Sequence, residues 1–355
     1  MTDLPVTSQD LARQDARRPG LADTNAMRLT WLLVSIAVLV LVVIASIAVG
    51  SRDIPVSTVF DALFSYDDAN NDHAIIQALR MPRTVLGVVI GAALGMAGAL
   101  IQALTRNPLA DPGILGVNAG AAFFVVIGIA VFGASSIGGY IWFAFLGAVI
   151  TTVAVYAIGS AGRAGATPVR LTLAGVALGA VLAGISEGLM LLNPTTFDRM
   201  RHWRAGSLVS PGSDALWTIA PFVAAGLLLA LLVARPLNAI ALGEEMASAL
   251  GANIARTRAA VVLAVTLLAG AATAACGPIG FVGLMVPHVA RWIVGPDQRW
   301  IFAFTVVLAP VLLLTADILG RIVMRPGELQ VGIVTAFVGA PVLILLARRR
   351  RVSGL

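Results

Sequence analysis

The chain has 355 residues, of which 59% are hydrophobic and only 12% are charged, and its formal net charge is +6. Soluble domains carry roughly 25% charged residues, so this composition excludes an ordinary soluble protein and indicates an integral membrane protein built of helices. All 24 basic residues are arginine. The lack of lysine excludes a GxxxxGK[ST] nucleotide-binding loop and a catalytic lysine, and the scattered arginines argue against nucleic-acid binding.

The N-terminal part of the chain predicts a tail followed by a membrane anchor. Residues 1–28 are polar, with four arginines, four aspartates and no signal-peptide pattern, and predict a disordered cytoplasmic tail. The uncharged segment 29–50 predicts the first spanning helix. Residues 51–83 are polar and acid-rich, and Pro82 suits the first turn of a second span at 84–104.

Uncharged segments continue along the rest of the chain. Residues 112–162 are long enough for two spans, hinged at the sequence FGASSIGGY of residues 132–140. The remaining predicted spans are 171–192, 214–234, 259–276, 281–294, 300–319 and 330–347. The expected architecture is therefore an all-α membrane protein with one domain at 29–350, about ten helices, both termini cytoplasmic and a C-terminal tail at 351–355.

The distribution of arginine gives the orientation. With the N-terminus inside, sixteen arginines fall in the cytoplasm and eight outside, which agrees with the excess expected for cytoplasmic loops. Residues 235–258 are then cytoplasmic.

Glycine and proline interrupt the uncharged stretch between Arg258 and Arg291. Gly277 and Pro278 begin the sequence GPIGFVG, which would break a helix at membrane depth. Lipid permits such a break only where protein or a water-filled cavity covers the freed backbone. The sequence allows either a broken helix pair inside the bundle or a short outer turn.

The cytoplasmic sequence ALGEEMASALG, residues 241–251, predicts a short helix bounded by Gly243 and Gly251. Glu244 and Glu245 lie at its N-terminus, where the helix dipole favours negative charge. Ala247 and Leu250 share one side with Glu244, and Met246 adds a flexible apolar contact. A partner protein could grip this helix, or it could be an ordinary structured loop.

Four of the arginines predicted outside are of interest, because arginine is usually more frequent in cytoplasmic loops. Arg80 and Arg83 are expected to form an exposed basic pair that Arg321 and Arg325 could join. Carboxylates of an external protein would suit the guanidinium fork, and lipid phosphate is the alternative.

Two carboxylates fall inside predicted spans. Glu187 and Asp317 could couple transport to an ion, but both lie near the predicted outer edge, so a position at the membrane interface is the favoured account for each. His73, His202 and His288 show no metal-ligand spacing, and the lone Cys276 can form no intramolecular disulfide, so no bound metal or cofactor is expected.

Several stretches together resemble one family, the FecCD-type permease subunits of ABC importers for iron-siderophore complexes, haem and cobalamin. The resemblance covers about residues 29–350. It rests on RMPRT (80–84), GALIQALTRNPLADPGILGVNAGA (98–121), RLTLAGVALGA (170–180), ALGEEMASALG (241–251), GPIGFVGLMVPHVAR (277–291), TADILGR (315–321) and ELQVGIVTAFVGAPVLILLARRR (328–350). Cys276 stands where the family often has alanine, and Arg204 is a charge not expected at its position.

The resemblance implies ten-helix subunits that pair across a two-fold axis, as identical or related chains, each resting on an ATP-binding cassette subunit. ATP would bind that partner. The docking residues implied for the ATPase are Leu242, Gly243, Glu244, Glu245, Ala247, Leu250 and Gly251. Arg80, Arg83 and Arg321 would meet acidic residues of an extracytoplasmic, lipid-anchored binding protein. The implied translocation path or gate comprises Thr167, Leu171, Gly175, Glu187, Gly277 and Pro278.

The expected function is therefore import of a ferric siderophore across the bacterial cytoplasmic membrane by a subunit that is not itself an enzyme. Cobalamin or haem import by the same mechanism remains an alternative. An ion-coupled secondary transporter using Glu187 or Asp317 is the alternative from a different class, and a pore or scaffold is a third.

Overall fold

The structure is a computed structural model that describes residues 20–134, 137–161, 167–209 and 212–348. Within these ranges, seven helices are long and apolar enough to cross a membrane. They are α2 (Asn25–Ala48), α5 (Met81–Thr105), α7 (Ile137–Ser160), α8 (Pro168–Leu192), α10 (Gly212–Ala241), α12 (Ile254–Cys276) and α14 (Gln298–Val323). Three shorter apolar helices are α6 (Val117–Ala130), α13 (Val282–Val294) and α15 (Val331–Arg348). Together they confirm the predicted set of about ten helices.

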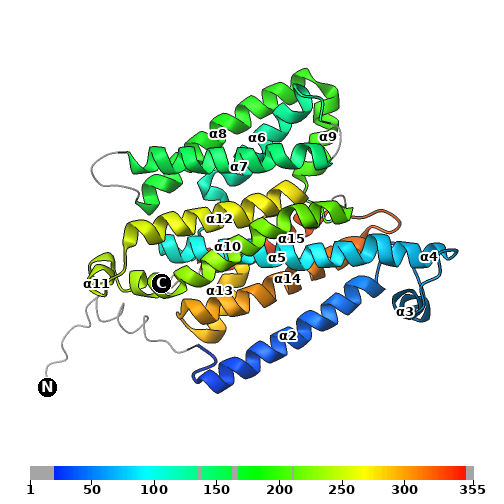
Figure 1. Cartoon of the computed structure of the whole chain (residues 1–355), viewed down its shortest axis with the longest axis horizontal. Coiled ribbons are helices and arrows are strands. Elements are labelled where there is room, and N and C mark those ends of the chain that lie inside the picture. The colour runs from blue at the N-terminus through cyan, green and yellow to red at the C-terminus, as the bar shows by residue number, and fades with distance from the viewer. Residues whose placement is uncertain (1–19, 135–136, 162–166, 210–211, 349–355) are drawn as a thin grey trace.

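The long helices run side by side, with α2 along one edge of the bundle and α6, α7 and α8 along the opposite edge (Figure 1). Helix α5 lies between them and is almost entirely buried. Its glycines explain the close packing, because a Cβ on Gly91 would lie 2.6 Å from the Cα of Pro310 in α14. A Cβ on Gly98 would lie 1.8 Å from the carbonyl oxygen of Gly283 in α13. The helices therefore meet backbone to backbone, as small residues allow in membranes.

The expected polar segment 51–83 contains helices that hydropathy alone did not predict. These are α3 (Val56–Phe64), α4 (Asn71–Ala74) and a π-helical stretch, η1 (Ile75–Arg80), that runs directly into α5. A further short helix, α9 (Pro194–Arg204), follows α8. Helices α3, α4 and α9 lie at one end of the bundle, and α11 (Glu244–Ala249) lies at the other (Figure 1). With the N-terminus cytoplasmic, the first end is the outer one and α11 marks the inner one.

The prediction of a disordered tail is wrong for residues 20–28. The backbone amides of Leu21 and Ala22 donate hydrogen bonds to the carbonyls of Trp292 and Ile293 at 3.1 and 2.9 Å. The hydroxyl of Thr24 accepts a hydrogen bond from the Met27 amide, so α2 begins with a side-chain cap four residues earlier than expected. Residues 1–19 and 351–355 of the two expected tails lie outside the described part of the chain.

The break between α12 and α13 is covered by protein. Helix α12 ends at Cys276 and α13 begins at Val282, and both Gly277 (φ 71°) and Phe281 (φ 69°) adopt left-handed backbone conformations. The amide of Ser207 donates to the Cys276 carbonyl at 2.8 Å. Because α13, at ~1.5 Å per residue, is shorter than a bilayer core of ~30 Å, the intervening chain must return part of the way into the membrane. This arrangement fits the broken pair rather than a simple outer turn.

Candidate functional site

One carboxylate organises the outer end of the bundle. Asp317 of α14 is fully buried, and Arg83 of α5 donates to it from Nε and Nη2 at 3.0 and 2.6 Å. Arg321, one turn further along α14, donates to the same carboxylate from Nε at 3.1 Å. The expectation that Asp317 sits at a lipid interface is wrong, because it lies inside the protein between two arginines.

The outer arginines are held by the end of α2. Arg321 donates from Nη1 to the carbonyls of Ser46 and Val49 at 2.7 and 3.0 Å. Arg80 donates to the carbonyls of Ile47 and Ala48 at 3.0 and 2.6 Å. The C-terminus of a helix carries unsatisfied carbonyls and a partial negative charge, so two guanidinium groups are favourable there. This capping accounts for arginines on the side of the membrane that usually has few.

The prediction of an exposed basic pair is therefore wrong. Arg80 is 5% exposed and Arg321 is 1% exposed, because the hydrogen bonds of both side chains join α2 to α5 and α14. Arg83 keeps 11% of its side chain exposed and also donates to Glu328 at 2.7 Å. Of the three arginines, Arg83 is the one that an external partner could approach without dismantling the helix contacts.

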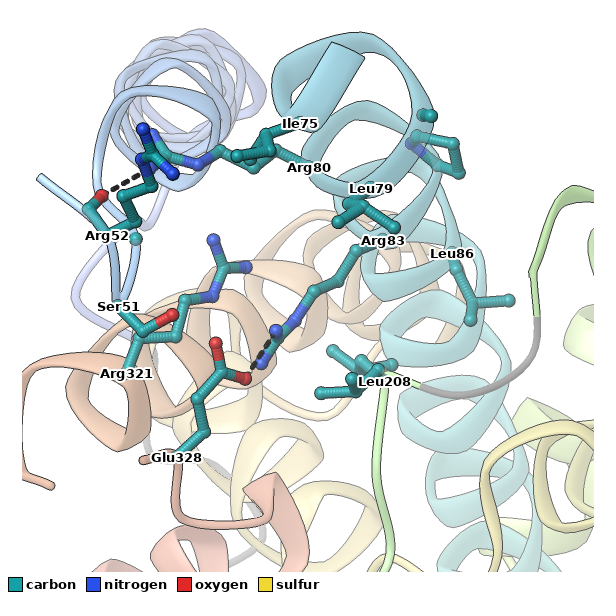
Figure 2. Close-up of a pocket in the computed structure, with 14 residues that line it drawn as sticks. Ser51, Arg52, Ile75, Leu79, Arg80, Arg83, Leu86, Leu208, Arg321 and Glu328 are labelled. Carbon is teal, nitrogen blue, oxygen red and sulfur yellow. Dashed lines mark hydrogen bonds and ion pairs between the residues drawn. The ribbon is translucent and has the colours of Figure 1, made fainter. Parts of the chain in front are cut away.

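Two cavities adjoin this cluster. The first, of about 170 Å³, is lined by Arg80, Arg83, Arg321, Glu328 and Leu208 among others (Figure 2). The second, of about 360 Å³, extends toward the break between α12 and α13. Its lining includes Tyr140, Arg199, Trp203, Cys276 and Glu328. Glu328 borders both cavities. It begins the stretch 328–350 that resembles the FecCD-type permeases, but a lone glutamate in a loop has no local pattern that would place it beside Arg83.

Of the three residues of α8 expected to line a path, Leu171 and Gly175 face the protein interior. Leu171 is buried, and a Cβ on Gly175 would lie 1.8 Å from the carbonyl oxygen of Ile114. Ile114 belongs to η2, a 3-10 helix at Pro112–Leu115. Thr167 caps α8 by accepting from the Arg170 amide at 3.4 Å. The large apolar side chains exposed on α8 are Val169, Leu173, Val176, Val181, Ile185, Leu191 and Leu192.

Close packing at Gly175 gives a test with a matched control. Gly175→Ala is expected to destabilise the protein by about 1 to 3 kcal/mol, because the added methyl group meets backbone that cannot move aside. Gly184→Ala on the same helix meets no atom within 4 Å and should leave stability unchanged or slightly higher. The apparent unfolding temperatures of the two purified variants provide the comparison. Equal temperatures would contradict the packing against η2.

Glu187 and Arg204 form an ion pair at the outer end of α8, where α9 follows. Both side chains are about half exposed. The charge at Arg204 that the sequence left unexplained thus has a partner 17 residues away. Gly277 is buried against the carbonyl oxygen of Trp203, whereas Pro278 is partly exposed.

The short helix at the inner end forms as predicted, between Gly243 (φ 109°) and Gly251 (φ 81°). The side of α11 that is exposed differs from the side that the sequence predicted. Glu244 accepts from Arg258 of α12 at 2.5 Å, and Ala247 is fully buried, so both residues fasten α11 to the bundle. Ser248, Ala249 and Gly251 are exposed, and so are four larger side chains, Leu242, Glu245, Met246 and Leu250. These four residues, called the α11 face below, form an apolar surface with one carboxylate.

The chain that carries α11 is fixed to the rest of the inner end. Asn238 of α10 donates to Asp297 at 2.8 Å, and Asp297 also accepts from the amide of Arg299 at 3.1 Å. Although partial burial acts to raise it, hydrogen bonds from Arg299 and Asn238 hold the pKa of Asp297 below its ordinary value. The carboxylate is therefore ionised at neutral pH and joins α10 to the start of α14.

Comparison with known proteins agrees with this architecture. The model of the FecCD transport family matches residues 38–349. The ferric enterobactin transport system permease protein FepD of Escherichia coli (strain K12) is 48% identical, over 94% of this chain and 99% of its own length. The probable siderophore transport system permease protein YfiZ of Bacillus subtilis (strain 168) is 41% identical, over 88% and 94%.

A solved structure has the same fold. It is described as an inward-facing conformation of a metal-chelate type ABC transporter, and it matches with a TM-score of 0.79 and 25% identity. The match covers 91% of this chain and 99% of the other. With a family model covering most of the chain and relatives aligned over nearly their full length, this multi-pass protein of the plasma membrane belongs to the FecCD transport family.

Proposed function

We propose that this chain is the membrane-spanning permease subunit of an ABC importer that moves a ferric siderophore into the cell. The observation that carries the proposal is the 48% identity to a ferric enterobactin permease over almost the whole of both chains. Energy comes from ATP hydrolysed by a partner subunit, in keeping with a chain that has no lysine for a P-loop.

The inner end suits an ATPase partner. The α11 face presents three large apolar side chains to the cytoplasm, and Glu244 and Ala247 hold the helix in place behind it. Two ATPase subunits, one for each of two paired permeases, would grip these faces. The exposed apolar side of α8 supports pairing with a second permease, identical or related, around a central path.

The outer end suits a binding protein that delivers the substrate. Of Arg80, Arg83 and Arg321, Arg83 is the one that keeps some exposure, and the other two support it from within. Closure of the ATPase pair on ATP would move α11 and alternate the path between outward and inward access. The fixed contacts of Asn238 and Asp297 would carry that movement into α10 and α14.

The alternatives receive less support. Both carboxylates considered for ion coupling are paired with arginine, Asp317 with Arg83 and Arg321, and Glu187 with Arg204. A transported ion could bind either carboxylate only by displacing its arginine partners. Cobalamin or haem import by the same mechanism is an alternative substrate assignment, and the named relatives favour the siderophore.

Reconstituted transport tests the proposal. The permease pair, its ATPase and its binding protein, placed in vesicles, are expected to accumulate ferric siderophore only with hydrolysable ATP, and a non-hydrolysable analogue should abolish uptake. Uptake that persists without ATP and collapses with an uncoupler would overturn the ABC mechanism. ATP-driven uptake of cobalamin or haem but not of a ferric siderophore would overturn only the substrate assignment.

A further inference from the structure

Helix α3 at the outer end has three distinct faces. Its inner face, Val59 and Ala62, is buried against Ile54 and Ile76 in a small apolar cluster separate from the main core. Ile47 at the end of α2 packs against the same cluster, so α3 is fixed to the outer end of α2. The position of the helix is therefore set by the fold.

A second face of α3 is apolar and uncovered. It comprises Val56, Phe60, Leu63 and Phe64, which recur with helical spacing on one side. Phe60 is 63% exposed and Phe64 is 73% exposed, and their ring centroids lie 4.6 Å apart. Leaving two large aromatic rings in water costs about 25 cal/mol of free energy for each Å² of exposed apolar surface. The third face, with Ser57 and Asp61, is polar and exposed.

The orientation of α3 separates these faces in a definite way. Helix α3 lies beyond the outer end of α2 and runs across the direction of α2 and α5 (Figure 1). At ~1.5 Å per residue, α2 is slightly longer than a bilayer core of ~30 Å, so its outer end reaches the headgroups. Arg52 and Asp53 follow α2, and α3 begins three residues later, at Val56. A helix at this depth and in this orientation lies along the membrane surface.

Helix α3 is fixed to the end of a helix that is itself largely exposed and apolar. Helix α2 exposes Ile36, Val40, Leu41 and Ile44 along its length, as expected of a helix at the edge of the bundle. Its one aromatic residue, Trp31, lies near the inner end. Aromatic side chains normally mark both membrane interfaces. On the outer side of α2 this role falls to Phe60, Phe64 and the half-exposed Tyr66.

We propose that α3 is an interfacial helix whose Val56, Phe60, Leu63 and Phe64 face lies in the outer leaflet, at the boundary between headgroups and acyl chains. Its polar face, with Asp61, points to water. Amphipathic helices bind in this way through apolar side chains on one face and polar groups on the other. The face carries no charge that would select a protein partner, and α3 is fixed to α2, most of which is exposed and apolar.

Spin labels test the proposal in the assembled importer within vesicles of phosphatidylethanolamine and phosphatidylglycerol. Cys276 is the only cysteine of the chain and is buried, so single labels can be placed with Cys276→Ala as background. Phe60→Cys and Phe64→Cys are compared with Asp61→Cys as the matched control. Labels at 60 and 64 are expected to collide several-fold more with oxygen, relative to a water-soluble nickel chelate, than the label at 61.

Each other outcome overturns the proposal. Equal nickel collision at all three positions would place the apolar face in water. Protection of positions 60 and 64 from both reagents would show that protein covers the face, and protection that appears only when the binding protein is added would make it a docking surface. Normal ATPase activity of the labelled complexes verifies that each variant is folded and assembled.

Discussion

Asp317→Asn is expected to lower the stability of the protein by about 3 to 5 kcal/mol, the usual cost of removing one partner from a buried ion pair. The carboxylate neutralises Arg83 and Arg321 where almost no water reaches them. Without it, two guanidinium groups remain buried close together, and only Arg83 keeps a carboxylate partner, in Glu328. The apparent unfolding temperature of the purified chain in detergent measures the effect.

Asp198→Asn is the matched control for this experiment. Asp198 pairs with Arg201 at 3.6 Å, and both side chains are more than half exposed, so its loss should cost at most about 1 kcal/mol. Asp317→Glu, which keeps the charge, should recover part of the lost stability. Equal unfolding temperatures for Asp317→Asn and Asp198→Asn would contradict the role of Asp317 in holding the outer end together.

Met246→Asp combined with Leu250→Asp is expected to release the ATPase from the membrane subunit. Both side chains are more than half exposed in the isolated chain and would be covered by the proposed partner. Burying such a side chain contributes about 1.5 to 3 kcal/mol, so each substitution should weaken docking by about tenfold or more. Co-purification of the ATPase and substrate-stimulated ATP hydrolysis measure the loss.

Met324→Asp provides the control for the α11 face. Met324 is also about half exposed, but it lies in the outer loop after α14, away from the cytoplasm. This variant should retain the ATPase. A Met246→Asp and Leu250→Asp double variant that retains the ATPase and couples hydrolysis normally would exclude the α11 face as the docking surface.

The features that the sequence predicted are those with a local signal. Uncharged runs mark spanning helices because each must satisfy its own backbone hydrogen bonds in lipid. Gly243 and Gly251 bound α11 because both adopt backbone conformations that other residues avoid. Gly277 marks the break after α12 for the same reason, so these elements could be placed without knowledge of the fold.

The features that the sequence missed depend on contacts between distant segments. Arg83 meets Asp317 from 234 residues away, so no local pattern could show that both are buried. The contact with η2 decides which side of α8 faces inward at Gly175. Because the sequence of α8 is largely apolar on every side, its pattern does not show which side that is. Hydropathy likewise passed over α3, because its charged neighbours made the whole segment look like a loop.

The capping of α2 has a consequence for the order of biogenesis. Helix α2 is made before α5 and α14, but the guanidinium of Arg321 that binds its terminal carbonyls comes 275 residues after Ser46. Arg80 can reach the same end soon after α5 is inserted. Helix α2 is therefore held at its outer end in two stages, provisionally by Arg80 and finally by Arg321. A chain that stops before α14 would leave α2 attached by the earlier contact alone.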